Sequence, residues 1–215
     1  MKRFSLFFPG VFLLSFSLWL WVGPIPYLFA ADSRVRILFL GDSISAGLGV
    51  EPEYAYPALI HDMLKDKGVQ GGVNITNGSI SGSTTAGALS RLKWFLKLKP
   101  DILVLALGAN DGLRGLSTVE MAGNLDKAIA LAKDKGIRVI LAGMKIPPNY
   151  GLEYARAFYE VFVSLADKHK ISFIPFLLED VAGKASLNQA DGIHPNREGH
   201  WIIAVTVLPY ILEQL

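Results

Sequence analysis

The chain has 215 residues, no cysteine, four histidines and a formal net charge of +2 at pH 7. This length fits one domain with a sizeable core plus a processed segment. The lack of cysteine excludes disulfides, a thiol nucleophile and an N-terminal lipid attachment point, and four scattered histidines argue against a structural zinc site.

The first 31 residues have the pattern of a secretory signal peptide. Lys2 and Arg3 precede an apolar run over residues 4–31 that ends in two alanines. This order of charged, apolar and small residues predicts cleavage and export to the periplasm or beyond the cell. The alternative is an uncleaved inner-membrane anchor, because residues 4–22 are close to spanning length. We expect membrane contact only through this segment, if it stays uncut.

The rest of the chain, residues 32–215, is formally neutral. Segment 1–31 holds two of the 21 Lys and Arg residues and none of the 19 Asp and Glu residues, which leaves 19 of each sign. A neutral domain gives no argument for nucleic acid or an anionic membrane surface as a partner. We predict one domain over residues 32–215 and expect it to be a monomer.

Apolar runs of strand length alternate with amphipathic segments of helix length along this domain. We predict strands at 35–40, 73–76, 102–107, 138–141 and 171–174. We predict helices at 54–67, 86–98, 119–135, 152–169 and 197–215, the last kinked at Pro209. Five strand-then-helix units predict an α/β fold, a three-layer α/β/α sandwich around a five-stranded parallel sheet, because right-handed crossovers place helices on both faces.

Functional side chains of such a sheet are expected just after its strands. The first strand runs directly into Gly41, Asp42 and Ser43. Alone, Ser43 could be a nucleophile, a helix N-cap or a turn residue. A nucleophile would need a base, an acid that orients the base, and oxyanion donors.

Two glycine-rich stretches fail as phosphate-binding motifs. Residues 82–87 have the glycine spacing of a P-loop, but Ala88 and Leu89 stand where Lys and Ser or Thr are required. Residues 47–49 begin a dinucleotide fingerprint, but Pro52 occupies its third glycine position. We therefore expect no nucleotide cofactor.

A base and an orienting acid are available in one turn before the last helix. Asp191 lies three residues before His194, so a turn can place both side chains on one side of the backbone. The alternative is an ordinary surface turn. No acid or serine motif accompanies His61 or His169, and His200 lacks the Asp partner, so we expect all three to be structural or solvent-exposed.

Oxyanion donors are available on the loops after the second and third strands. The side-chain amide of Asn110 and the backbone N–H groups of Gly82 and Ser43 would together make three donors. The alternative for Asn110 is a common Asn-Asp-Gly turn. We expect Asp42 and Asp111 to accept hydrogen bonds that fix their loops.

Four blocks of this sequence resemble, in order, those of the SGNH (GDSL) hydrolases. They are Gly-Asp-Ser-Ile at 41–44, Ser-Ile-Ser-Gly at 79–82, Gly-Ala-Asn-Asp at 108–111 and Asp-Gly-Ile-His-Pro at 191–195. The stretches 110–115 and 147–151 resemble the periplasmic branch of acyl-CoA thioesterases, lysophospholipases and arylesterases. The one departure is Ile44 for leucine, which we expect to be neutral core packing.

The resemblance implies the flavodoxin-like SGNH-hydrolase fold and a role for each site residue. Ser43 would be the nucleophile and an oxyanion donor, Gly82 and Asn110 the other donors, His194 the base and Asp191 its orienter. The implied function is an exported serine esterase that hydrolyses esters or thioesters of acyl or aryl substrates through an acyl-enzyme. The resemblance implies neither cofactor nor metal.

Apolar residues on two loops are expected to bind the substrate. We assign this role to Leu113, Ile146, Pro147 and Tyr150, a lining that suits an acyl chain or aryl ester better than a sugar acetate. The alternatives are a carbohydrate O-acetyl esterase and a non-catalytic binding domain of the same fold. Arg114 could meet a substrate head group or be an ordinary exposed arginine.

Overall fold

The computed structural model describes Met1 and residues 34–69 and 72–215. Apart from Met1, the predicted export segment 1–31 lies outside the described residues. No helix within the described ranges is long and apolar enough to cross a membrane.

All five predicted strands form one parallel sheet in the order β2-β1-β3-β4-β5. They are β1 (Val35–Gly41), β2 (Val73–Asn77), β3 (Ile102–Ala106), β4 (Arg138–Ala142) and β5 (Ser172–Ile174). β1 lies between β2 and β3, with Ile37 opposite Ile75 on one side and Ile102 on the other. Every residue of β3 is buried, as its unbroken apolar sequence predicts for a strand covered on both faces.

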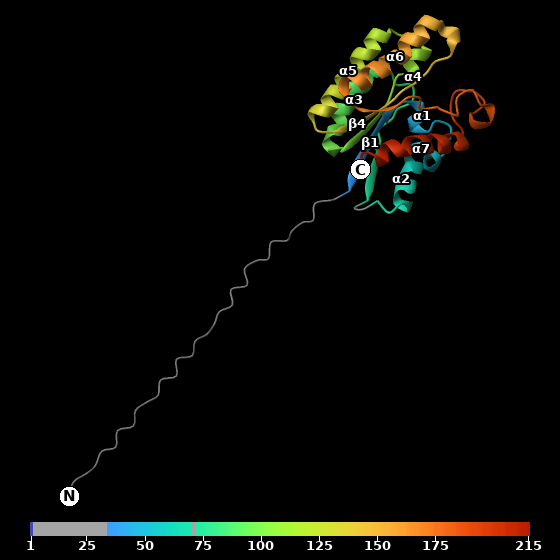
Figure 1. The fold of residues 1–215 in the computed structure, drawn as a ribbon. Coiled ribbons are helices and arrows are strands. Elements are labelled where there is room, and N and C mark those ends of the chain that lie inside the picture. The colour runs from blue at the N-terminus through green and yellow to red at the C-terminus, as the bar shows by residue number, and fades with distance from the viewer. Residues whose placement is uncertain (2–33, 70–71) are drawn as a thin grey trace. The chain divides into compact units, whose positions relative to one another are not determined.

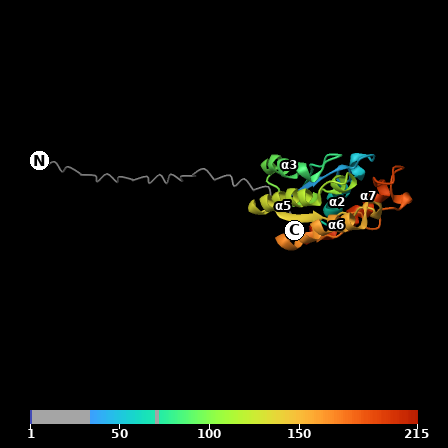
Figure 2. The same ribbon diagram turned by 90° about the horizontal axis from the view of Figure 1, so that it is seen from above.

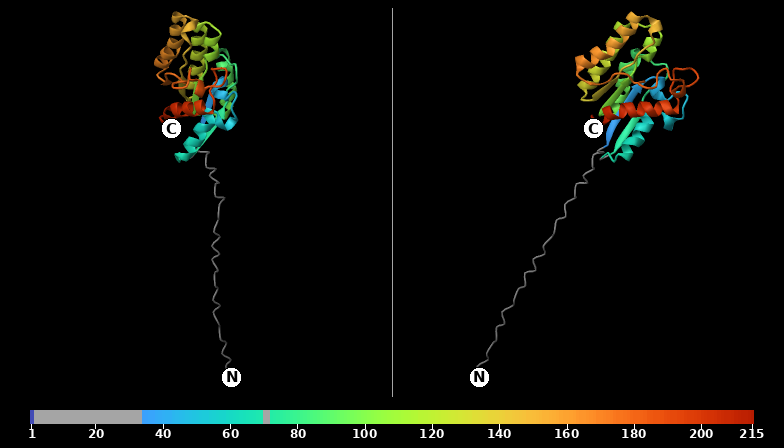
Figure 3. Two further views of the ribbon diagram at one scale, coloured as in Figure 1. Left: turned by 90° about the vertical axis from the view of Figure 1, so that its right-hand side faces the viewer. Right: turned by 45° about the vertical axis from the view of Figure 1, so that its right-hand side comes forward.

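Helices cover both faces of this sheet, which confirms the predicted three-layer sandwich. α2 (Tyr56–Asp66) lies beside α7 (Arg197–Leu212) on one face (Figures 1 and 3). α5 (Thr118–Asp134) lies between α3 (Ala88–Phe95) and α6 (Leu152–His169) on the other face (Figures 1 and 2). The shorter elements are α1 (Ser43–Ala46), α4 (Ala109–Leu113), and the 3₁₀ turns η1 (Pro52–Tyr54), η2 (Thr85–Gly87), η3 (Leu96–Leu98), η4 (Pro148–Tyr150) and η5 (Ala185–Leu187).

The helices bury the faces that their spacing predicts. In α2 the fully buried residues Tyr56, Ile60 and Leu64 follow each other at intervals of four. In α6 the rings of Phe158 and Phe162 pack edge to face, with centroids 5.5 Å apart. Burial of these side chains fixes the helices against the sheet and makes the sheet edge a rigid base for loops.

Some boundaries differ from the sequence prediction. The helix predicted at 54–67 begins only at Tyr56, because Ala55 is extended and separates it from η1. The helix predicted at 86–98 is divided into η2, α3 and η3. The last helix continues through Pro209 and ends at Leu212 rather than 215.

The chain reverses its direction of travel across the sheet between β1 and β3. It passes from β1 to the edge strand β2 and returns to the other side of β1 as β3. Loops that leave neighbouring strands at such a switch point diverge and make a crevice at the C-terminal edge of the sheet. The loops that carry Ser43, Gly82 and Asn110 follow β1, β2 and β3, so all three meet at this edge.

Candidate active site

Ser43 is the first residue of α1, directly after β1. The N-cap of that helix is Asp42, whose Oδ1 accepts a hydrogen bond from the N–H of Ile44 at 3.1 Å. The cap alternative for Ser43 is therefore wrong, and its hydroxyl is available for other contacts. Gly41 permits this sharp entry, because a Cβ at this position would overlap the Ser45 hydroxyl.

His194 lies between Ser43 and Asp191. Its Nε2 is 2.9 Å from Ser43 Oγ, and its Nδ1 is 2.7 Å from Asp191 Oδ2. An ionised carboxylate can only accept, so Nδ1 carries the ring proton and Nε2 accepts from the serine hydroxyl. The three residues therefore have the connectivity of a nucleophile, a base and an orienting acid.

Asp191 also organises the backbone of its own turn. Its Oδ1 accepts from the N–H groups of Ile193 at 2.9 Å and His194 at 3.0 Å. The backbone and side-chain hydrogen bonds from His194 lower the pKa of Asp191 to about 2, with a further contribution from Ile193. The carboxylate is thus ionised throughout the neutral range.

The turn that carries Asp191 and His194 is closed at its base. Asn188 and Pro195 form an antiparallel bridge, and Asn188 Nδ2 donates to the carbonyls of Val181 and Lys184 at 2.8 and 2.9 Å. Gln189 Nε2 donates across to the Leu48 carbonyl at 2.7 Å. These bonds tie the histidine turn to the segment that follows α1, which fixes His194 opposite Ser43.

Arg114 joins Gly82 and Asn110, two of the three residues expected to donate to an oxyanion. Gly82 has a φ of +77°, a left-handed conformation that favours glycine. Within the described residues, the backbone N–H groups of Ser43 and Gly82 donate to no protein acceptor. Arg114 Nη2 donates to the Gly82 carbonyl at 3.0 Å and to Asn110 Oδ1 at 3.4 Å, which places these two residues around one guanidinium group.

Arg91 holds the loop after β2 against the end of β1. Its Nη1 donates to Ser83 Oγ at 2.9 Å and to the Gly41 carbonyl at 3.3 Å, and its Nη2 donates to the Gly78 carbonyl. The Ser79 hydroxyl accepts from the Gly41 N–H at 3.0 Å. Nothing in the sequence marks Arg91 for this role, because a single arginine inside a helix belongs to no motif.

Asp42 and Asp111, the two remaining acids of the four sequence blocks, accept hydrogen bonds that fix their loops, as expected. Asp111 lies in α4, a short helix where the sequence suggested a turn, and accepts from Thr85 N and Oγ1 at 2.9 and 2.6 Å. Asp42 is buried, and this burial raises its pKa to about 6 against the lowering effect of hydrogen bonds from Ile44 and Asn110. Asp42 bonds to Ile44 and Asp111 bonds to Thr85, so the two acids do not form a catalytic pair with each other.

The other histidines lie outside the Ser43 and Asp191 cluster. Buried His200 accepts from the Tyr56 N–H at 3.4 Å, and burial, followed by the charge of His194, lowers its pKa to about 4. His169 has a structural role, as expected, because Asp126 Oδ1 of α5 lies 2.6 Å from its Nε2. The two residues are 43 positions apart in the sequence, and the packing of α5 against α6 brings them together. Among the described residues no three His, Asp or Glu side chains group in a way that could hold a metal ion.

An apolar cleft of about 410 Å³ opens beside Ser43 and Asn110, whose neighbours Ile44 and Ala109 line it. Leu113, Ile146 and Pro147 line the cleft as predicted. Tyr150 does not line the cleft; its hydroxyl donates to the carbonyl of Leu113, a lining residue, at 3.2 Å. The remaining wall residues were not predicted from the sequence: Met144, Lys145, Phe176, Leu178, Ala182, Gly183, Asn188, Gly192 and Ile193.

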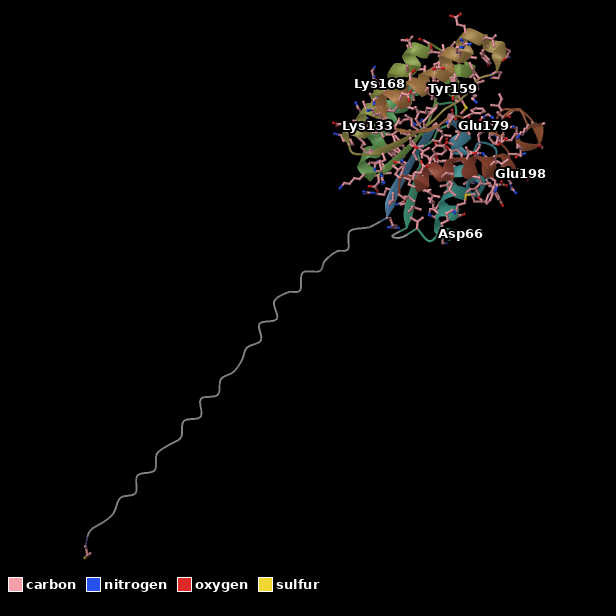
Figure 4. The ribbon with its side chains drawn as sticks, viewed as in Figure 1. Asp66, Lys133, Tyr159, Lys168, Glu179 and Glu198 are labelled. Atoms are coloured by element: carbon pink, nitrogen blue, oxygen red, sulfur yellow. The ribbon has the colours of Figure 1, made fainter. Side chains whose placement is uncertain are left out.

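Lys145 is the one charged side chain in this lining. Its Nζ lies 4.8 Å from the centre of the Phe176 ring and 3.9 Å from the carboxylate of Glu179, which Figure 4 labels. The ammonium group is thus partnered within the protein. The rest of the wall is aliphatic, aromatic or glycine apart from the side chain of Asn188, which bonds to backbone carbonyls.

Known proteins share both this sequence and this fold. Residues 39–202 match the model of the GDSL-like Lipase/Acylhydrolase family. The chain is 39% identical to an arylesterase of Vibrio mimicus over 187 residues, 86% of this chain and 92% of that protein. It is 40% identical over 180 residues to esterase TesA of Pseudomonas aeruginosa, covering 83% and 85% of the two chains. It is 36% identical over 177 residues to thioesterase 1/protease 1/lysophospholipase L1 of Escherichia coli K12, covering 82% and 83%.

Solved structures agree with these relatives. A crystal structure of TesA superposes with a TM-score of 0.80 at 39% identity, covering 84% of this chain and 99% of that one. The esterase EstA of a Pseudoalteromonas species, inhibited by monoethylphosphonate, superposes with a TM-score of 0.78 at 33% identity, covering 83% and 97%. The chain therefore belongs to the GDSL-like lipase/acylhydrolase family, the SGNH hydrolases, and is a hydrolase of ester bonds.

Proposed function

We propose that this protein is an exported serine esterase that cleaves acyl or aryl esters and thioesters through an acyl-enzyme on Ser43. The observation that carries the proposal is the chain of contacts from Ser43 Oγ to His194 Nε2 at 2.9 Å and from His194 Nδ1 to Asp191 Oδ2 at 2.7 Å. This series of contacts ends at Ser43, whose neighbour Ile44 lines an apolar cleft. A nucleophile, its base and a substrate-sized space are thus in one place.

The reaction follows from the direction of these hydrogen bonds. Ser43 Oγ attacks the carbonyl carbon while His194 Nε2 takes the hydroxyl proton, and Asp191 stabilises the imidazolium that forms. The carbonyl oxygen becomes an oxyanion that accepts from the N–H groups of Ser43 and Gly82 and from the Asn110 amide. His194 then protonates the leaving alcohol or thiol, which departs and leaves an ester on Ser43.

The second half of the reaction uses the same groups. Water enters the position that the leaving group vacated, and His194 Nε2 removes its proton as the oxygen attacks the acyl carbon. A second oxyanion forms in the same place and collapses to release the carboxylic acid. Ser43 recovers its proton from His194, so the cycle requires no cofactor.

The substrate class follows from the lining of the cleft. Its walls are apolar, from Ile44 and Ala109 beside the site to Phe176 and Leu178 farther along. An acyl chain or aryl group gains free energy when it leaves water for such walls. A sugar acetate would instead need polar partners and a stacking surface at the mouth, so this lining favours acyl and aryl substrates. The three relatives named as arylesterase, esterase and thioesterase/lysophospholipase support the same class.

A fluorophosphonate probe tests the nucleophile. The folded wild-type protein should be labelled on Ser43, and the label should be absent from Ser43→Ala and strongly reduced in His194→Ala. Ser90→Ala is a matched control, because Ser90 lies in α3 and bonds only to the carbonyl of Gly87. An unlabelled but folded wild-type protein would eliminate the enzyme proposal in favour of a non-catalytic binding domain.

A hydrolysis panel tests the substrate class. Purified protein should be offered p-nitrophenyl esters of graded chain length, acyl-CoA, lysophospholipid and acetylated xylan. Catalytic efficiency should rise with chain length beyond acetate until the cleft is filled, and xylan acetate should be the poorest substrate. A preference for acetylated xylan would assign the site to carbohydrate esters instead.

Export and the monomeric state complete the proposal. Export is supported by the order of charged, apolar and small residues in segment 1–31. Fractionation of expressing cells and N-terminal sequencing should recover a chain that begins near residue 32 in the periplasm. An intact chain in the membrane fraction would support the anchor alternative, and light scattering of the purified protein would settle the oligomeric state.

A further inference from the structure

Arg114 connects two of the proposed oxyanion donors. Its Nη2 donates to the Gly82 carbonyl at 3.0 Å and to Asn110 Oδ1 at 3.4 Å. Gly82 belongs to the loop after β2, whereas Asn110 belongs to α4 after β3. One exposed guanidinium group therefore spans two loops that approach the site from different strands.

The contact with Asn110 determines which way its amide faces. A guanidinium group can only donate, so the atom that it contacts must be the amide oxygen. The amide nitrogen then lies on the side away from the guanidinium group.

A flipped amide would be opposed by Arg114. Its NH₂ group would face the N–H donors of the guanidinium, with no acceptor between them. The unflipped orientation leaves the amide N–H groups to donate to an oxyanion. An amide in the wrong orientation would present an oxygen to that negative charge.

Arg114 is also joined to Asn110 through the main chain. It follows Asn110 by one helical turn, and its N–H donates to the Asn110 carbonyl at 3.2 Å. Asp111 holds the same short helix to Thr85 through bonds of 2.9 and 2.6 Å. The base of the arginine is therefore fixed, and its guanidinium reaches the Gly82 loop from a defined position.

We propose that Arg114 is a positioning residue for ester hydrolysis, which holds the Asn110 amide nitrogen and the Gly82 loop toward the oxyanion. This inference rests on the proposed function. A different role would follow if Arg114 bound an anionic head group. The two roles affect different kinetic constants, because positioning acts on the transition state and head-group binding acts on the ground state as well.

The test compares Arg114→Met and Arg114→Lys with the wild type on p-nitrophenyl butyrate, which is uncharged, and on butyryl-CoA, which is anionic. We expect Arg114→Met to lower kcat by about 10-fold on both substrates with little change in KM, less than the roughly 10²–10³-fold cost of removing an oxyanion donor. Arg114→Lys, which keeps a donor of reduced reach, should recover part of kcat. Arg138→Met is the matched control, because Arg138 begins β4 and so lies at the N-terminal ends of the strands, opposite the site. This variant should have the kcat and KM of the wild type.

A double variant separates positioning from general damage. In an Asn110→Ala background there is no amide to orient and only the Gly82 contact remains to be lost, so adding Arg114→Met should lower kcat by less than it does in the wild type. Three results would overturn the inference: an unchanged kcat, a loss confined to KM for butyryl-CoA, or full additivity with Asn110→Ala. In each case the wild type would still hydrolyse esters and Ser43→Ala would not. If Ser43→Ala were as active as the wild type, the proposed function itself would fail.

Discussion

Asp191 holds His194 at two points: its Oδ2 lies 2.7 Å from the ring Nδ1, and its Oδ1 accepts from the main-chain N–H at 3.0 Å. The first contact selects the tautomer in which Nε2 faces Ser43. The second fixes the backbone from which the ring projects. A carboxylate only three residues from the histidine thus sets both the tautomer and the position of the proposed base.

Asp191→Asn should therefore lower kcat/KM by roughly 10³–10⁴-fold, because an amide can stabilise the wrong histidine tautomer. Hydrolysis of a p-nitrophenyl ester measures this effect. Asp134→Asn, an exposed change at the end of α5, is the control and should retain wild-type kinetics. A loss below 10-fold in the folded variant would remove Asp191 from the triad.

Asn110→Ala should lower kcat by about 10²–10³-fold, since it removes one donor from the developing oxyanion. KM should change little, because the ground-state carbonyl gains less from the donor than the oxyanion does. The measurement needs a substrate for which acylation limits the rate. Wild-type turnover by this variant under those conditions would show that the amide serves only the structure of α4.

Asp42 should reduce the stability of the fold at neutral pH. Its pKa is about 6 in the folded protein against an ordinary 3.8, so the folded state keeps a proton that the unfolded chain has released between these values. Stability is lost as the pH rises through this window, by ~3 kcal/mol. Asp42→Asn, which can still cap Ile44, should raise the free energy of unfolding at pH 7.5 by up to this amount, with no gain below pH 4. Urea denaturation at both pH values tests this, and an equal gain at both would show that titration is not the cause.

His200 should have the opposite pH dependence. Its pKa is about 4 in the fold against an ordinary 6.5, so the unfolded chain binds the extra proton between these values. Stability from this residue is present above pH 6.5 and is lost as the pH falls toward 4, which offsets the Asp42 effect across the shared window. Relative to the wild type, Asp42→Asn should become steadily more stable as the pH rises from 4 to 6. His200→Asn should become steadily less stable over the same range, and parallel curves for all three proteins would refute both assignments.

The cleft should set the preference for chain length. Ala182 lines the cleft on the segment after β5, so Ala182→Trp should fill part of the volume beyond the catalytic residues. KM for a p-nitrophenyl decanoate should rise, while kinetics on the acetate should stay near the wild-type values. Gly87→Ala, in η2 and away from the cleft lining, is the control. Equal losses on both esters would indicate damage to the site rather than a shorter cleft.

The sequence by itself determined the strands and the class of fold, and it named the five residues of the candidate site, whose catalytic roles stay a prediction. Period and composition are local properties, so an unbroken apolar run such as residues 102–107 identifies a buried strand without any knowledge of its neighbours. The site residues were also visible because each lies in a short block directly after a strand or before the last helix. The chain order of the blocks then named the family.

Only the tertiary structure decided which side chains meet. Asp42, and not Ser43, caps α1, a choice that depends on backbone angles at the end of β1. Arg91 and Arg114 hold the loop after β2 through hydrogen bonds to residues that lie 8 to 50 positions away in the sequence. The cleft likewise combines residues that follow β1, β3, β4 and β5. Such contacts arise because parallel strands bring distant loops to one edge of the sheet, and no local pattern records that neighbourhood.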